Sequence, residues 1–333
     1  MKIGLSYDIK ERTSKAEGLP EDAFEEYDSP ETVEALTAAI GSHGHTVLKL
    51  GGGSAFLKNI QDTRPDLVFN IAEGLGNYRS REAQVPSVLE MLGIPYSGSD
   101  PLTLSVCLEK PLTKQMVAAC GVATPKWCVI NDISELESFN WKEFPFPAFA
   151  KPAHEGSSKG IRDASRVDNE RELKELIKEQ MALYAQPMMV EEFIQGEEVT
   201  VGLLGNNPTR IIGIMHVIPR QKSPDFVYSL EVKRDWRNQV EYECPARFDE
   251  SVLHKIQDSC LKAFKALGIR DLARMDFRIS PGGTPYFLEV NPLPGLNPKS
   301  GDYVIMGEAM GWSYNSLIGA VLNSAVERCG LGS

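Results

Sequence analysis

The sequence predicts an α/β fold, because short apolar strands alternate with capped helices along most of its 333 residues. Residues 2–7 (KIGLSY) and 46–50 (TVLKL) have the pattern of strands on either side of a helix near residues 30–41. This order is a β–α–β unit, which favours a parallel sheet near the N-terminus. Residues 273–291 contain two strand patterns around a glycine turn, so we expect an antiparallel hairpin toward the C-terminus.

The first hundred residues support the parallel sheet element by element. The helix near residues 30–41 begins after an Asp28/Ser29 cap, and the proline that follows the cap is typical of a first helical position. Residues 66–70 (DLVFN) form a near-continuous apolar strand, and the helix after it ends at Gly93. The glycine run at residues 51–54 (GGGS) lacks the spacing of a dinucleotide site, so we interpret it as a loop.

The remaining residues predict further elements that divide the chain into three segments. Helices are expected at residues 103–120, 168–183, 249–267 and 313–328. Strands are expected at residues 127–130, 147–152, 188–194, 197–205 and 210–218, besides the hairpin. Joins near residues 100 and 195 predict domains at 1–103, 104–195 and 196–333.

Composition and charge exclude several classes of protein. The chain has 42% hydrophobic and 24% charged residues, which is typical of a globular protein of two or three domains. Its apolar runs are shorter than the roughly 20 residues of a membrane span, and its N-terminus reads as a strand, so we expect a cytoplasmic protein. Six scattered cysteines without C-x-x-C spacing argue against zinc and disulfides. A net charge of −11 disfavours a nucleic-acid surface, although a local basic pocket could still bind phosphate.

The hairpin at residues 273–291 places polar side chains in a predictable pattern. We take Gly282–Gly283 as a two-residue turn, which fixes the register of the two strands. The facing pairs are then Asp276 with Glu289 and Arg274 with Asn291. Because side chains alternate along strands, these four share one face of the ladder. The other face is expected to hold Met275, Phe277, Leu288 and Val290.

The facing carboxylates Asp276 and Glu289 predict a metal site. Two carboxylates directly opposite each other repel unless a cation lies between them. Oxygen ligands of this kind suit Mg²⁺ that a substrate phosphate also binds, and Arg274 beside them would contact the same phosphate. The alternative is a hairpin whose polar face simply lies in water.

A loop and several charged residues carry weaker signals of phosphate and nucleotide binding. The segment KPAHEGSSKG (151–160) follows an apolar strand, and its small residues would let backbone N–H groups approach an anion beside Lys151. Taken alone, the segment is better interpreted as a plain surface loop, and Lys110 and Lys233 as solvated lysines. Glu198 could accept ribose hydroxyls, although charged residues near turns usually face solvent.

Taken together, five stretches resemble the ATP-grasp superfamily, and specifically the D-alanine–D-alanine ligase family. They are MLGIPYSGSDPLTLSVCLEK, FAKPAHEGSSKG, VEEFIQGEEVTV, ARMDFRI and YFLEVNPLPGL, in the family's order and at about its spacing. The resemblance covers almost the whole chain. It implies an N-terminal Rossmann-like domain followed by two α+β lobes that enclose ATP.

The resemblance also implies roles for individual residues. ATP would contact Lys110, Lys151, Ser157, Ser158, Glu191, Glu192, Ile194, Glu198 and Lys233. Asp276, Glu289 and Asn291 would bind two Mg²⁺ ions, with Mn²⁺ as an alternative. Arg274, the Gly295 backbone N–H and Ser157 would serve catalysis. A carboxylate would be phosphorylated by ATP, and the acyl phosphate would then react with an amine to give an amide.

The substrate end departs from the family pattern. In NIAEGLGNYRSREAQ, Glu73 stands in place of the family's histidine, and Arg79 and Arg81 stand where acidic residues are usual. The family's glutamate for the first amino group has no clear match, with Glu26 as a nearby candidate. Further along, Arg234 replaces a loop tyrosine and Lys299 precedes the family serine at Ser300. Charged residues at these positions predict altered substrates, unless the arginines face water on a loop.

We therefore expect an ADP-forming carboxylate–amine ligase that acts on amino-acid-like molecules, with no nucleic-acid or membrane partner. The resemblance to the D-alanine–D-alanine ligase family also suggests a homodimer. One alternative is a true D-alanine–D-alanine ligase, and another is a non-catalytic ATP-binding regulatory protein. A nicotinamide oxidoreductase is disfavoured, because its glycine fingerprint is missing.

Overall fold

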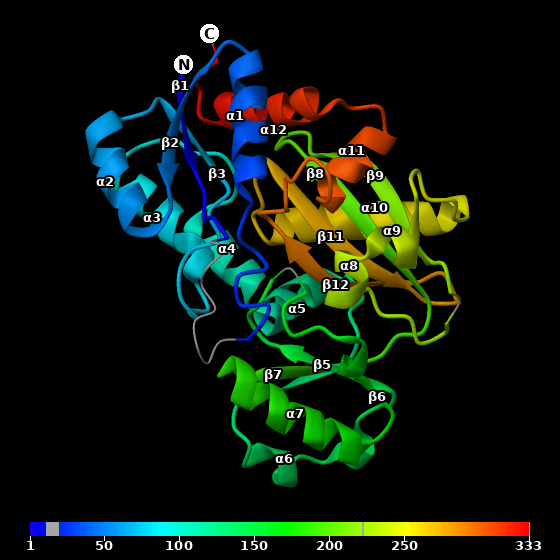
Figure 1. Ribbon diagram of the computed structural model, residues 1–333. Helices are drawn as coiled ribbons and strands as arrows, with labels where there is room; N and C mark the ends of the chain where they lie inside the picture. The colour runs from blue at the N-terminus through cyan, green and yellow to red at the C-terminus, as the bar shows by residue number, and fades with distance from the viewer. Residues whose placement is uncertain (11–19, 157, 222, 333) are drawn as a thin grey trace.

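The structure is a computed structural model that describes residues 1–10, 20–156, 158–221 and 223–332. Three sheets organise it, with strand orders β2-β1-β3, β4-β7-β5-β6 and β10-β9-β8-β11-β12. Each sheet falls within one of the three predicted segments (Figure 1), while the exact domain limits stay a prediction. Among the described helices, none is long and apolar enough to cross a membrane.

The N-terminal sheet is parallel, as the sequence predicts. Its strands are β1 (Lys2–Ser6), β2 (Thr46–Gly51) and β3 (Leu67–Asn70). Its helices are α1 (Pro30–Ser42), α2 (Gly53–Thr63) and α3 (Gln84–Leu92), with a 3₁₀ turn, η1 (Arg81–Ala83), before α3. Apolar side chains of α1 cover one face of the sheet, and those of α2 and α3 cover the other. The loop expected at residues 51–54 is wrong in part, because Gly53 already begins α2.

The central segment begins with two helices where the sequence predicts one. The helices α4 (Pro101–Leu108) and α5 (Lys110–Ala119) meet at Glu109, where a proline follows Lys110 at the start of α5. The sheet that follows consists of β4 (Trp127–Ile130), β5 (Ala148–Pro152), β6 (Arg166–Val167) and β7 (Met188–Glu192). Its helices are α6 (Glu135–Ser138) and α7 (Glu170–Tyr184), with short turns η2 (Trp141–Glu143) and η3 (Asp163–Ser165).

The C-terminal segment contains the largest sheet, which is antiparallel throughout. Its strands are β8 (Glu197–Leu204), β9 (Arg210–Pro219), β10 (Val240–Glu243), β11 (Leu272–Ile279) and β12 (Pro285–Asn291). Its helices are α8 (Leu230–Arg234), α9 (Trp236–Gln239), α10 (Glu250–Ala266), α11 (Asp302–Ala309) and α12 (Tyr314–Arg328). Side chains of α5 and α10 pack together against one face of this sheet.

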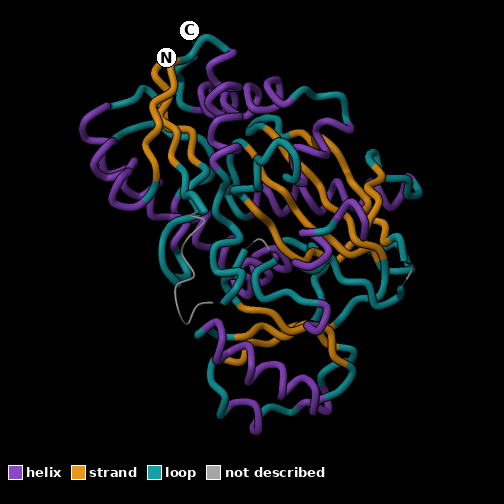
Figure 2. The backbone as a smooth tube through the Cα atoms, viewed as in Figure 1, coloured by secondary structure: helices purple, strands orange, loops and turns teal. Residues whose placement is uncertain are grey.

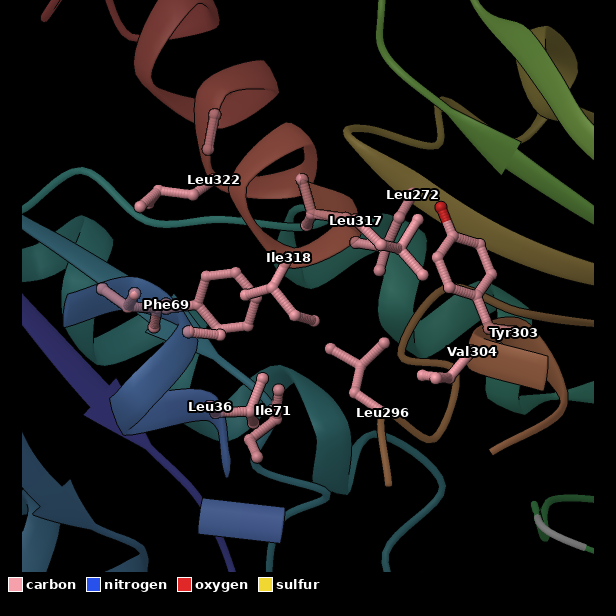
Figure 3. Packing of buried hydrophobic residues seen from close by; sticks show 14 of the residues in the cluster. Leu36, Phe69, Ile71, Leu272, Leu296, Tyr303, Val304, Leu317, Ile318 and Leu322 are labelled. Carbon is pink, nitrogen blue, oxygen red and sulfur yellow. The ribbon is translucent and has the colours of Figure 1, made fainter. Parts of the chain in front are cut away.

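One apolar core joins the two ends of the chain. Figure 3 shows Leu36 and Phe69 of the N-terminal layer close to Ile318 and Leu322 of α12, and all four are buried. In Figure 1, α12 accordingly lies beside α1. Leu296, which immediately follows Gly295, is buried in the same core. The core therefore fixes the turn after β12 relative to the N-terminal sheet.

Candidate functional site

The predicted register at the polar end of the β11–β12 hairpin is confirmed. Asp276 pairs with Glu289 and Arg274 pairs with Asn291, as the sequence predicts. The two-residue turn is wrong, because Ser280 pairs with Thr284 across the three-residue loop 281–283. A bulge between Asp276 and Phe277 restores the register by inserting one extra residue in β12.

The same bulge changes where Leu288 points. Leu288 is the extra residue, because Phe277 pairs with Phe287 while the preceding residue pairs with Glu289. Phe287 is fully buried in the core, whereas Leu288 lines a cavity on the opposite face. The expectation that Leu288 lies on the core face is therefore wrong. A bulge puts two neighbouring side chains on one face, which period-two alternation does not allow.

That cavity, which we call the inter-sheet cavity, lies between the two antiparallel sheets that Figure 2 shows one above the other. The smaller sheet contributes Phe149, Lys151 and Glu191, and the larger sheet contributes Thr200 and Asp276. The remaining walls include Ser158, Glu192, Ile194, Glu198, Lys233 and Glu289. Residues that are far apart along the sequence, such as Lys151 and Asp276, thus line one cavity.

A buried cluster of charged residues lies at the inter-sheet cavity. Glu191 lies 2.8 Å from Lys151 Nζ and 2.5 Å from Lys114 Nζ, and all three residues are buried. Burial tends to raise the pKa of Glu191, but the charges of Lys114 and Lys151 outweigh it and lower the pKa. Lys114 also donates to the Phe287 carbonyl at 3.0 Å. The predicted adenine-side residue Glu191 is therefore an ion-pair partner of both lysines.

The metal-side residue Glu289 lies among cations. Lys110 Nζ is 3.6 Å from Glu289 and also donates to the Glu155 carbonyl. Burial would raise the pKa of Glu289, but the charges of Lys110, Lys151 and Lys233 lower it well below its usual range. Glu289 is therefore held ionised, as a metal ligand must be.

The donor set of the hairpin fits a hard cation. Asp276 accepts from Thr200 Oγ1 at 2.7 Å and forms a two-point ion pair with Arg274. Asn291 Nδ2 is buried without a hydrogen-bond partner in the described part of the chain. Among the described residues, no three His, Cys, Asp or Glu side chains lie together as a metal site would require. The hairpin set differs from such a group because it has two carboxylates and one amide. Oxygen-only ligands of this type suit Mg²⁺.

Glu198 and Lys233 line the same cavity as Asp276 and Glu289 of the hairpin. Arg278 Nη1 and the Tyr228 backbone N–H both contact Glu198 Oε1, at 2.8 and 3.2 Å. Lys233 Nζ lies 5.0 Å from the centre of the Tyr228 ring, which is close enough for a cation–π contact. Both contacts of Glu198 use one oxygen, which leaves its other oxygen to face the cavity.

The small-residue loop closes one end of the cavity. Ser157 lies outside the described residues. Ser158 is 4% exposed, lines the cavity and has a φ of 59°, a left-handed conformation that is uncommon for serine. The Gly156 backbone N–H donates to Glu26 Oε1 at 2.6 Å, so this loop contacts the N-terminal segment.

A second opening, which we call the outer cleft, adjoins the inter-sheet cavity. Lys233 lines both, and the outer cleft also contains Glu26, Arg234 and Gly295. Arg234 is exposed and contacts Glu25 Oε2 at 2.8 Å. Ser300 and Arg274 line the outer cleft as well. The structure thus places the Gly295 turn in the outer cleft, which shares Lys233 with the inter-sheet cavity.

The other predicted substrate residues lie in different surroundings. Arg79 has a side chain that is 68% exposed and pairs with Glu109 at 3.0 Å. Arg81 is only 2% exposed, and its Nη2 lies 2.8 Å from Glu26 and 3.1 Å from Glu155. The exposed Lys299 side chain is 3.3 Å from Glu31. Of the two added arginines, one therefore faces water and the other is already paired.

The sequence analysis missed several residues of the site. Lys114 follows Lys110 by four positions on one helix, so helical spacing could have indicated it. Arg278 follows Asp276 by two positions on β11, so strand alternation could have indicated that it shares the polar face. No local pattern distinguishes Glu82 or Asp302, whose buried positions depend on packing between distant segments.

Comparison with known proteins identifies the family. The family profile described as D-ala D-ala ligase C-terminus matches residues 116–323, more than half of the chain. An uncharacterised protein of Sinorhizobium fredii is 32% identical over 305 residues, which cover 89% of this chain and 87% of that protein. A D-alanine–D-alanine ligase of Aquifex aeolicus is 34% identical over 272 residues, covering 82% of this chain and 87% of that enzyme.

Comparison of structures gives the same fold. The crystal structure of D-alanine–D-alanine ligase from Bacillus anthracis complexed with ATP has a TM-score of 0.73 and 21% identity, and the match covers 100% of this chain and 99% of that one. Together, the profile and the sequence relatives show that this chain belongs to the D-alanine–D-alanine ligase family of ATP-dependent carboxylate–amine ligases.

Proposed function

We propose that this chain is an ADP-forming ligase that joins the carboxylate of an amino-acid-like substrate to an amine through an acyl phosphate. One observation carries the proposal. Lys110, Lys151 and Lys233 converge on the Asp276–Glu289 pair at a cavity between two antiparallel sheets. Such an arrangement neutralises phosphate charge beside a cation site, which is what phosphoryl transfer requires.

ATP would occupy the inter-sheet cavity. Its adenine would lie near Glu191 and the backbone of Glu192 and Ile194, with Leu288 and Phe149 as apolar walls. Glu198 would accept the ribose hydroxyls through the oxygen that Arg278 does not contact. The phosphates would be bound by Lys110, Lys151 and Lys233, beneath the loop that contains Ser157 and Ser158.

Asp276, Glu289 and Asn291 would bind the divalent metal. Two Mg²⁺ ions are proposed, with Mn²⁺ as an alternative. The metal, when bound, supplies Lewis-acid neutralisation of phosphate charge. The ionised Glu289 supports this assignment, and Asn291 would bind the metal through its amide oxygen.

Arg274 and Gly295 would stabilise charge at the reacting carbonyl. Arg274 is buried and held by Asp276 and Asp302, which restricts its side chain to one orientation. Gly295 comes directly after Pro294 and lines the outer cleft, so its backbone N–H could face the developing oxyanion. Because ATP activates the carboxylate, positioning suffices and no protein nucleophile is needed.

The substrates need not be two D-alanines. Glu26, Glu73, Arg234 and Ser300 line the openings beside Gly295 and would contact the substrates. Arg79, Arg81 and Lys299 would act on substrates only indirectly, because the first and last are exposed and Arg81 is paired. The cytoplasmic location and the homodimer expected from the sequence stay predictions.

A panel of D- and L-amino acids, supplied singly and in pairs with ATP and Mg²⁺, tests the proposal. We expect ADP and phosphate release with selected pairs, and a dipeptide or amide identified by mass spectrometry. Exclusive and robust formation of D-alanyl-D-alanine would overturn the altered-substrate proposal. ATP binding without any product would favour a non-catalytic regulatory protein.

The variant Asp276→Asn tests the metal site. We expect turnover to fall by at least about a thousandfold, because the amide loses the charge that binds the metal. The exposed Asp258, paired with Lys262 on α10, provides the control Asp258→Asn, which should leave turnover unchanged. Full activity of Asp276→Asn would refute the hairpin assignment.

A further inference from the structure

A third cavity, which we call the acidic cavity, lies on the N-terminal side of the hairpin. It is lined by Glu26, Glu73, Glu82 and Glu155, together with Asn291 and Leu293. Glu26, Glu73 and Leu293 also line the neighbouring space that contains Gly295 and Asp28. The acidic cavity therefore opens beside the turn at which the carboxylate would be activated.

The cations at the acidic cavity are already paired with carboxylates other than Glu73 and Glu82. Lys110 also lines this cavity, and its Nζ lies 3.6 Å from Glu289. Arg81 pairs with Glu26 at 2.8 Å and with Glu155 at 3.1 Å. Lys159 pairs with the same two residues, at 3.5 and 2.5 Å. Arg81 and Lys159 thus balance Glu26 and Glu155, while Lys110 is paired with Glu289.

Glu73 and Glu82 form no ion pair with these cations. Within the described residues, neither carboxylate has an ion-pair partner or accepts a hydrogen bond, although Glu82 is only 7% exposed and lines the acidic cavity. Buried carboxylates without partners are costly and therefore rare. Asn291 Nδ2, which is also without a partner, belongs to the same cavity.

The electrostatics of the pair agree with a missing cation. Burial, followed in size by the charges of Glu82 and Glu26, raises the pKa of Glu73 well above its usual value. Burial also raises the pKa of Glu82 to about 7, although Arg81 opposes this shift. A ligand ammonium placed between the two carboxylates would remove this cost.

We propose that the substrate whose carboxylate is activated carries a second cationic group on its side chain, and that Glu73 and Glu82 bind it. The proposal rests on the ligase function proposed above. The substrate's carboxylate lies toward Asn291 and Gly295, and its side chain extends past Leu293 into the acidic cavity. An amino acid with a side-chain ammonium or guanidinium fits this chemistry.

Binding measurements test the proposal without requiring turnover. Calorimetry with ATP analogue and Mg²⁺ compares ornithine, lysine and arginine, in both chiral forms, with the uncharged norvaline and norleucine. We expect the basic amino acids to bind at least about tenfold more tightly, because a desolvated charge pair contributes that much or more. Equal binding of charged and uncharged side chains, or no binding of basic amino acids, overturns the proposal.

Variants locate the effect. Glu82→Gln and Glu73→Gln should each lower the preference for basic amino acids over norvaline by at least about tenfold. Glu179→Gln, at an exposed position of α7, is the control and should keep the full preference. Circular dichroism melting confirms that each variant folds, and a preserved preference in both cavity variants contradicts the proposal.

Product analysis separates this proposal from the ligase function itself. The activated substrate becomes the N-terminal residue of a dipeptide product, so mass spectrometry should find the basic residue there. ADP formation and dipeptide synthesis with alanine but not with basic amino acids would overturn the substrate class while leaving the ligase function intact. Tight binding of basic amino acids without ADP formation would overturn the ligase function while leaving the cation-binding role of the acidic cavity intact.

Discussion

Lys114 connects three elements of the site through a single buried charge. It is fully buried on α5, forms an ion pair with Glu191 of β7 and donates to the Phe287 carbonyl of β12. Burial lowers its pKa to about 8, against the opposing charge of Glu191. The residue therefore fixes Glu191 relative to the hairpin.

Replacing this lysine should weaken both the fold and nucleotide binding. We expect Lys114→Met to lower the free energy of unfolding by about 3 kcal/mol, near the low end for breaking a buried ion pair, because Lys151 still pairs with Glu191. Chemical denaturation measures this loss, and the KM for ATP should rise. Lys178→Met, at a half-exposed position on α7, should be nearly neutral. An unchanged unfolding free energy in Lys114→Met would contradict this role.

Glu82 predicts a pH dependence with a defined sign. Its folded-state pKa is about 7, so the unfolded chain loses this proton at lower pH than the folded chain. The free energy of unfolding contributed by Glu82 therefore falls as pH rises from the usual glutamate range to about 7. Glu82→Gln removes this loss. The free energy of unfolding of the variant, relative to that of the parent protein, should therefore rise by up to about 3 kcal/mol from pH 5 to pH 8. Denaturation at both pH values checks this, and an equal difference at each would rule it out.

At the level of the element, the hairpin shows why sequence predicts some features and not others. Alternation and the glycine turn were enough to pair Asp276 with Glu289. The turn itself has three residues, and a bulge that inserts Leu288 compensates for the difference. A bulge depends on the neighbouring strand and on what packs against both faces, so the local pattern does not reveal it.

The two turn glycines distinguish these geometries experimentally. Gly283 has a φ of 71°, and a Cβ there would lie 2.9 Å from Val252 Cγ2. We expect Gly283→Ala to destabilise the protein by roughly 1–2 kcal/mol, because L-residues disfavour this conformation. A Cβ at Gly282 would lie 3.9 Å from its nearest neighbour, Ser280 Oγ, so Gly282→Ala should cost less than about 0.5 kcal/mol. A two-residue turn with both glycines left-handed would instead make both substitutions costly in thermal or chemical denaturation.

At the level of the whole molecule, contacts between distant segments build the substrate side of the site. The sequence predicted most strands of the three sheets and the motifs of the family, because those depend on local patterns, but it missed the short strands β6 and β10. It could not show that α1 packs on α12, or that Leu296 is buried in the same core as Phe69. It also could not separate Arg79 from Arg81, which are two positions apart but lie in water and in a buried ion network.

That buried network joins the N-terminal segment to the central lobe. Arg81 contacts Glu26, Glu155 and the His154 carbonyl, and Glu26 in turn accepts from the Gly156 backbone N–H. Removing Arg81 would leave two buried carboxylates to share Lys159 alone. The ion network should therefore govern how firmly the small-residue loop is held against the N-terminal segment.

We expect Arg81→Met to lower the free energy of unfolding by about 3–5 kcal/mol, because it breaks a buried ion pair from one side. Hydrogen exchange should accelerate most at residues 154–156, whose backbone meets this network. Arg79→Met is the matched control, since its exposed pair with Glu109 should contribute at most about 1 kcal/mol. If the two variants lose equal stability, or if exchange at 154–156 is unchanged in Arg81→Met, the network does not join the two parts of the molecule.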